Sequence, residues 1–135
     1  MKTPPLATRI EALTYALLRV VSGALFSFHG VQKIFGVLSP FKPPMWTQMW
    51  VGGIIELVTG GLIALGLFTR PAAFLASGTM AVAYFQFHWK LELAAGKWLP
   101  AVNKGELAVI YCFLFLFLTT RGDGSFSLGA RTTRR

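Results

Sequence analysis

The sequence predicts an all-α fold, a four-helix transmembrane bundle that runs up-down-up-down with both termini on the cytoplasmic side. Hydrophobic residues make up 54% of the 135 residues and charged residues only 13%, whereas a soluble domain carries about 25% charged residues. A soluble domain of this size could not bury so much apolar surface. The charges are also segregated, because long uncharged stretches alternate with short segments that contain most of the Lys and Arg.

Four apolar runs are the expected membrane-spanning helices. A hydrocarbon core of about 30 Å requires about 20 helical residues, with a lower limit of about 17, so the last three runs are near the short end. Helices are expected for all four, because an unpaired backbone is excluded from lipid. A cleaved signal peptide is disfavoured for the first run, which is long and contains Arg19 and His29. The runs cover residues 12–35, 50–68, 71–88 and 105–120.

The connections between the runs differ in character. Residues 68–71 are expected to form a tight helical hairpin in which Pro71 suits the first turn of the next helix. Residues 39–49 are rich in proline and aromatic residues, so we expect an irregular loop in the membrane interface. Residues 89–104 are amphipathic enough for a short surface helix. The predicted organisation is an N-terminal cytoplasmic segment (1–11), a membrane domain (12–120) and a basic cytoplasmic tail (121–135).

Lys and Arg set the expected orientation, because cytoplasmic segments of membrane proteins are enriched in these residues. Seven of them lie on the side of the termini and five on the opposite side, which favours cytoplasmic termini. All four tryptophans fall on the opposite side, as an aromatic interface belt would. The first side holds Lys2, Arg9, Arg70, Arg121, Arg131, Arg134 and Arg135, and the second holds Lys33, Lys42, Lys90, Lys97 and Lys104.

Polar residues from all four expected helices fall at the same depth, in the outer third of the bundle. His29 and Lys33 are four residues apart and share a helix face. Ionisable side chains within a membrane cost about 2.5–3.5 kcal/mol each and usually face the bundle interior in pairs. Arg19 and Arg70 lie near the inner side and are interpreted as structural charges. The candidates for a polar binding pocket are His29, Gln32, Lys33, Glu56, Tyr84, His88, Asn103 and Glu106.

Glu56 needs a cation or a hydrogen-bond donor, and the simplest expected partner is Lys33 or a protonated His29. Glu56 lies in one row with Gly52 and Gly60, and glycines allow another helix to approach closely. An alternative interpretation is that the polar residues only keep four helices in register. Lys33 alone could also extend its amine to the membrane interface.

Net charge and cysteine content exclude several classes of function. The net charge of +8 would suggest nucleic acid in a soluble protein, but no nucleic-acid motif is present and anionic lipid headgroups are the expected contact. The single cysteine, Cys112, excludes an internal disulfide and a C-x-x-C redox pair. Because Cys112 lies within an apolar run, it is interpreted as a packing residue.

A series of short motifs runs in order along nearly the whole chain, from about residue 17 to residue 128. The motifs are Leu18-Arg19, Phe28-His29-Gly30-x-Gln32-Lys33-x-Phe35-Gly36, Gly53-x-x-Glu56-x-x-x-Gly60, Gly66-x-x-Thr69-Arg70-x-Ala72-Ala73, Phe87-His88, Asn103-Lys-Gly-Glu106-Leu-Ala and Gly122-x-Gly124-x-Phe126-Ser127-Leu128. In this order they resemble the DoxX family of small membrane proteins.

The resemblance implies a four-helix, multi-pass protein of the bacterial inner (cytoplasmic) membrane. Members of the family are linked to quinol oxidation, to electron transfer from thiosulfate to quinone, and to resistance to oxidative or thiol stress. The family's polar signature falls on Arg19, His29, Gln32, Lys33, Glu56, Arg70, His88, Asn103 and Glu106.

Three functional hypotheses follow. In the first, the chain is a quinone-linked redox subunit or accessory that has no self-contained catalytic motif and needs a soluble or membrane redox partner protein to supply electrons. In the second, it is a non-catalytic membrane scaffold or chaperone for a partner complex. In the third, it binds a small solute or a transition metal, and it could form homo-oligomers. For the quinone, the acid/base set would be His29, His88, Glu56 and Glu106, with Lys33 or Gln32 at a carbonyl oxygen.

Overall fold

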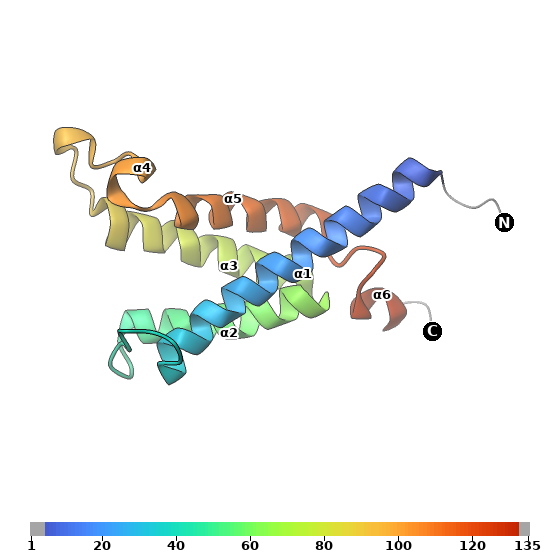
Figure 1. The fold of residues 1–135 in the computed structure, drawn as a ribbon, viewed down its shortest axis with the longest axis horizontal. Helices are drawn as coiled ribbons and strands as arrows, with labels where there is room; N and C mark the ends of the chain where they lie inside the picture. The colour runs from blue at the N-terminus through green and yellow to red at the C-terminus, as the bar shows by residue number, and fades with distance from the viewer. Residues whose placement is uncertain (1–4, 133–135) are drawn as a thin grey trace.

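The computed structural model describes residues 5–132, with side chains to residue 130, and the regular secondary structure of this part of the chain is all helical, without strands. Lys2 and the side chains of Arg131, Arg134 and Arg135, which enter the expected charge asymmetry, lie outside the described residues. The elements are α1 (Leu6–Phe35), α2 (Gln48–Leu65), α3 (Thr69–Ala83), the π-helical η1 (Tyr84–Trp89), the short 3-10 helix η2 (Ala94–Gly96), α4 (Pro100–Asn103), α5 (Glu106–Arg121) and α6 (Leu128–Thr132) (Figure 1).

Two of the described helices, α1 and α2, are long and apolar enough to cross a membrane. α1 begins earlier than the expected apolar run, at Leu6. α3 continues directly into η1, so the two form one helical segment. The connection after η1 contains short helical pieces, η2 and α4, rather than one surface helix.

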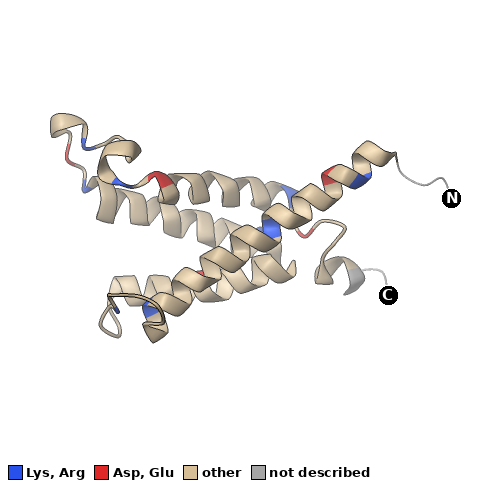
Figure 2. Cartoon of the chain, in the orientation of Figure 1, with Lys and Arg blue, Asp and Glu red and all other residues tan. Residues whose placement is uncertain are grey.

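The helices pack in a chain of neighbours, with α1 against α2, α2 against α3, and α3 against α5. Figure 1 shows α3 and α5 side by side and α1 crossing the molecule diagonally. The connections 36–47 and 90–105 lie at one end of the molecule, on the left of Figure 1, whereas the α2–α3 turn and α6 lie at the other. Most of the charged residues gather toward the two ends, with long uncharged stretches between them (Figure 2).

Glycines bring α1 and α2 into direct backbone contact. A Cβ on Gly23 would lie only 2.5 Å from the Ala64 nitrogen and 2.7 Å from the Gly60 carbonyl oxygen. The expected role of Gly52 in such a contact is wrong, because a Cβ there would meet nothing within 4 Å. The neighbouring Gly53 faces α1 instead. Each residue turns a helix by about 100°, so one position decides which face a side chain occupies.

An aromatic cluster joins α1 to α5 in the core. Phe26 is 1% exposed, and its ring centroid lies 4.7 Å from that of Phe115 and 5.5 Å from that of Tyr111. Small residues on α3, including Ala73 and Ala76, are buried in the same core. Many large apolar side chains remain exposed around the outside of all the long helices. This pattern suits a molecule whose solvent is lipid.

Candidate functional site

An ion pair joins α1 to α2 near the end that carries the 36–47 loop. Lys33 Nζ lies 2.6 Å from Glu56 Oε1, and the side chains of Lys33 and Glu56 are 32% and 3% exposed. The expected pairing of Glu56 with Lys33 is therefore confirmed. Lys33 lies in the last turn of α1. Gly53 leaves room for the aliphatic part of the Lys33 side chain, since a Cβ on Gly53 would lie only 2.8 Å from Lys33 Cβ.

The second oxygen of Glu56 has no protein partner. Oε2 is buried and accepts no hydrogen bond from the described residues. A buried carboxylate oxygen without a hydrogen bond is costly, and most such oxygens in proteins are satisfied by protein, water or ligand. Oε2 is therefore available to accept a hydrogen bond from water or from a bound molecule.

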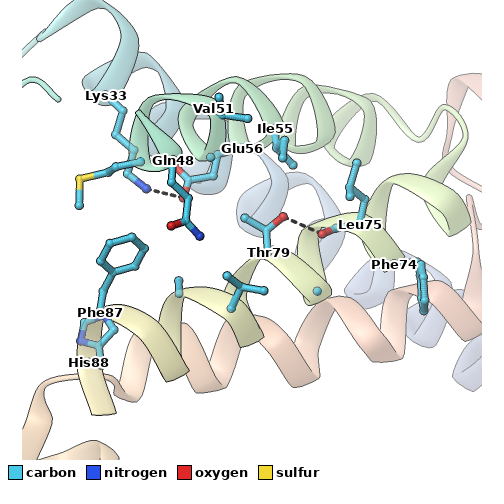
Figure 3. Close-up of a pocket in the computed structure, with 15 residues that line it drawn as sticks. Lys33, Gln48, Val51, Ile55, Glu56, Phe74, Leu75, Thr79, Phe87 and His88 are labelled. Atoms are coloured by element: carbon cyan, nitrogen blue, oxygen red, sulfur yellow. Dashed lines mark hydrogen bonds and ion pairs between the residues drawn. The ribbon is translucent and has the colours of Figure 1, made fainter. Parts of the chain in front are cut away.

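Two cavities meet at the ion pair. The first, the α2–α3 groove, has a volume of about 480 Å³ and lies between α2 and α3–η1 (Figure 3). The second, the polar chamber, has a volume of about 220 Å³ and lies between α1, α3–η1 and α5. Both are lined by Lys33, Glu56, Ala83 and His88, so the Lys33–Glu56 pair stands at their junction.

The polar chamber brings together side chains that can exchange protons. Its ionisable lining comprises His29, Lys33, Glu56, His88, Lys104 and Tyr111. The His29 ring lies edge-on to the Tyr111 ring, with centroids 6.5 Å apart. His88 Nδ1 lies 3.3 Å from the Asn103 carbonyl oxygen. Because a carbonyl oxygen only accepts, Nδ1 is the protonated nitrogen in this contact, and Nε2 is the nitrogen that can accept a proton.

The π-helical segment η1 shapes one wall of the groove. It places Phe87 and His88 on the groove lining, and Figure 3 shows the Phe87 ring opposite Gln48 at the end of the groove near Lys33. Gln48 Nε2 donates a hydrogen bond to Gln86 Oε1, which ties the start of α2 to η1. π-helical turns occur frequently at functional sites.

The remaining predicted pocket residues lie outside both cavities at this junction. Gln32 Nε2 donates to the Leu38 carbonyl oxygen at 3.4 Å, and Glu106 is exposed at the start of α5. Asn103 Nδ2 donates to the Lys97 carbonyl oxygen at 2.9 Å. Tyr84 donates its hydroxyl hydrogen to the Trp98 carbonyl oxygen. These two side chains thus organise the 90–105 connection.

In the same connection, Lys97 donates a hydrogen bond to Glu92, and this bond lowers the pKa of the exposed Glu92 carboxyl. The pair lies on the surface, away from the junction of the two cavities. Within residues 5–132, no group of three or more His, Cys, Asp or Glu side chains is arranged to hold a metal ion.

Arg19 and the residues after α5 form a separate network at the opposite end. The buried Arg19 donates through Nη1 to the carbonyl oxygens of Ile63 and Ala64, at 2.5 and 2.8 Å, and through Nη2 to that of Phe126 at 2.8 Å. Asp123 Oδ1 accepts from the Thr69 backbone nitrogen at 2.9 Å, which caps the start of α3. Arg70 lies against this segment, since a Cβ on Gly122 would lie 2.9 Å from its Nε; Arg70 itself is exposed.

The DoxX family model matches residues 14–89, more than half of the chain. The chain belongs to the DoxX family. An uncharacterized protein of Haemophilus influenzae is 40% identical over 123 aligned positions, which cover 84% of this chain and 86% of the relative. No solved structure matches the chain. As a DoxX membrane protein, the chain presents its exposed apolar helix faces to the lipid bilayer.

The matched DoxX region contains the Lys33–Glu56 pair, His29 and His88. The chain also brings Lys104 and Tyr111, which follow that region, to the same chamber. Sequence reasoning did not identify Lys104, Tyr111 or Gln48 as site residues. Tyr111 lies in an apolar run and Gln48 in a loop-like segment, so neither carried a local signal.

Proposed function

We propose that the DoxX chain crosses the bacterial inner membrane four times, up-down-up-down, through α1, α2, α3 with η1, and α5, with both termini in the cytoplasm. The domain division would then be 1–11, 12–120 and 121–135. The arrangement of connections in Figure 1 supports this topology, because successive connections lie at opposite ends. α5 has 16 residues, and a slightly short helix is accommodated by local thinning of the bilayer.

We propose further that the chain is a quinone-binding subunit or accessory of a membrane redox system. The observation that carries this proposal is the unpartnered Glu56 Oε2, which lies at the junction of an apolar groove and a polar chamber. A quinone is a flat polar ring with a long apolar tail, and it needs this combination of surroundings. Lys33 Nζ can donate to a ring carbonyl oxygen, and Glu56 Oε2 can accept from a ring hydroxyl group.

The chemistry that the quinone supplies when bound is the exchange of two electrons and two protons. The chain's residues would move the protons, because Glu56 and His88 border both cavities and His29 and Lys104 line the chamber beyond them. Cys112 is the only cysteine, so the chain has no dithiol couple of its own. The electrons would therefore pass to or from a redox partner protein.

A scaffold for a partner complex is the second candidate. The Lys33–Glu56 pair and the Arg19 hydrogen bonds each join segments that are distant in sequence, as a purely architectural set of polar residues would. In that case the unpartnered oxygen of Glu56 would bind water or nothing. A metal site receives no support from the described residues.

The test is the quinone content of protein purified in nanodiscs made from the native membrane, measured by mass spectrometry. Glu56→Gln keeps the shape of the side chain but removes the charge, and we expect it to lower bound quinone at least about tenfold, the effect of losing a charged hydrogen bond of 1.5–3 kcal/mol. Glu106→Gln is the matched control, because Glu106 is exposed. Equal quinone content in folded Glu56→Gln and wild-type protein would overturn the proposal and favour the scaffold.

A further inference from the structure

Two glycines line the α2–α3 groove, Gly52 on α2 and Gly78 on α3. A Cβ built on either one meets no atom within 4 Å. These glycines therefore do not serve helix contact, unlike Gly23 and Gly60. Their missing side chains leave space that would otherwise be occupied, and the width of the groove depends on that space.

The groove is apolar along its length and polar at one end. Ile55 and Val82 form part of its walls, and Leu75, which is 50% exposed, lies where the groove opens to the surface. Figure 3 shows Lys33 and Glu56 at one end and Phe74 toward the other. A molecule in the groove would thus place its polar group at the ion pair and its apolar part toward the lipid.

We propose that the α2–α3 groove receives the isoprenoid tail of a quinol, which enters sideways from the bilayer between α2 and α3. Gly52 and Gly78 determine the width of this entrance. The inference rests on the proposed function, because it assigns the quinol ring to the Lys33–Glu56 pair. It adds the tail site, the route of entry and the two glycines that keep the groove open for an apolar chain.

The charges at the polar end favour a quinol over a phospholipid. Glu56 Oε2 needs a hydrogen-bond donor, and the hydroxyl group of a quinol supplies one. A phosphate headgroup would bring a second negative charge beside a carboxylate that already shares the single amine of Lys33, and like charges at this distance repel each other.

The probes for the test are a benzoquinol with a decyl tail and the same benzoquinol without a tail, kept reduced under anaerobic conditions. Binding is measured with protein in nanodiscs, so that the bilayer supplies the tailed probe. The test variants are Gly52→Leu and Gly78→Leu, which fill the groove from either wall. The control is Gly61→Leu, because Gly61 also has open space around its missing Cβ but does not line the groove.

We expect both groove variants to weaken binding of the tailed probe by about tenfold or more, since overfilling a packed site has costs of this order. Binding of the tailless probe should not change, and Gly61→Leu should affect neither probe. If Gly78→Leu does not fold, Gly78→Cys in a Cys112→Ala background can be blocked after folding with a bulky apolar thiol reagent.

The outcomes separate the two proposals. If the folded groove variants bind the tailed probe as the wild type does, while Glu56→Gln still weakens the tailless probe, the tail site is wrong and the proposed function stands. If wild-type protein binds neither probe, or Glu56→Gln changes neither, both proposals fail. A phospholipid retained by the wild type and lost in Gly78→Leu would overturn the quinol assignment in favour of a structural lipid.

Discussion

At the scale of single residues, the Lys33–Glu56 pair combines a structural and a functional demand. One carboxylate oxygen fixes α1 to α2, and the other is left without a protein partner. A purely structural ion pair gains from satisfying both oxygens, because each unpaired buried oxygen lowers stability. The incomplete pairing is thus the strongest single argument that the residue does more than join two helices.

Because Lys33 compensates the buried charge of Glu56, the effects of substituting the two residues on the free energy of unfolding should not be additive. Lys33→Met leaves the Glu56 charge buried and uncompensated, so we expect it to lower the free energy of unfolding by about 1–3 kcal/mol. Adding Glu56→Gln should recover a large part of that loss, because the buried charge is then removed. The measurement is reversible unfolding in detergent, with Lys42→Met in the exposed loop as a control. Simple additivity of the two substitutions would show that the side chains do not interact.

Sequence reasoning reached this pair because charge alone limits the partners of a buried acid. Glu56 needs a cation or a hydrogen-bond donor in an apolar segment, and Lys33 or a protonated His29 was the simplest partner at its depth. The hydrogen bond of His88 to the Asn103 backbone had no such signal, because a carbonyl oxygen is available at every residue. Local pattern therefore identified the acid and its cation, whereas the partner of His88 depended on how the 90–105 connection folds.

At the scale of elements, the close packing of α1 and α2 depends on a glycine face on which the sequence placed Gly60 correctly but took Gly52 in place of Gly53. Gly52 and Gly53 are adjacent, and hydrophobic pattern does not distinguish them in a helix that is apolar on nearly every side. The π-helical geometry of η1 could not be predicted from the sequence either, because its residues also suit an α-helix. The helical segments themselves were predictable, since lipid permits few alternatives for long apolar runs.

The α1–α2 contact predicts different effects for glycines on two faces of the molecule. Gly23→Ala places a Cβ against the α2 backbone, and we expect a loss of about 1–3 kcal/mol in the free energy of unfolding. Gly61→Ala faces open space and should be neutral or stabilising by up to about 1 kcal/mol, because alanine favours the helix. Thermal unfolding in detergent checks both. Equal stability of the Gly23→Ala and Gly61→Ala variants would argue against close packing at Gly23.

Arg19 predicts how the segment after α5 is held. Its guanidinium group reaches carbonyl oxygens on α2 and at Phe126, on two separate segments. Lysine carries one ammonium group and lacks the planar fork, so Arg19→Lys should release residues 122–130. Hydrogen exchange of these amides should become faster by about tenfold or more, which corresponds to losing one or two hydrogen bonds. Arg9→Lys, at an exposed site, should leave the exchange rates unchanged.

At the scale of the whole molecule, function depends on which end of the bundle faces which compartment. The two cavities meet near the end that carries the 36–47 and 90–105 connections. If that end faces outward, protons from a bound quinol would leave through the polar chamber to the outside, and the Arg19 network would lie on the cytoplasmic side. The charge asymmetry of the sequence favours this orientation.

Single-cysteine labelling in intact cells tests that orientation and the number of crossings together. In a Cys112→Ala background, Ser39→Cys and Ala94→Cys should react with a membrane-impermeant maleimide added from outside, because both lie in the outer connections. Ala7→Cys and Ser125→Cys should react only after the membrane is opened, because they flank the first and last crossings on the cytoplasmic side. If all four sites label in the reverse pattern, the orientation is inverted, and the polar chamber would release protons to the cytoplasm. Labelling of Ser39→Cys without Ala94→Cys would exclude four crossings, because four crossings place both connections on the same side of the membrane.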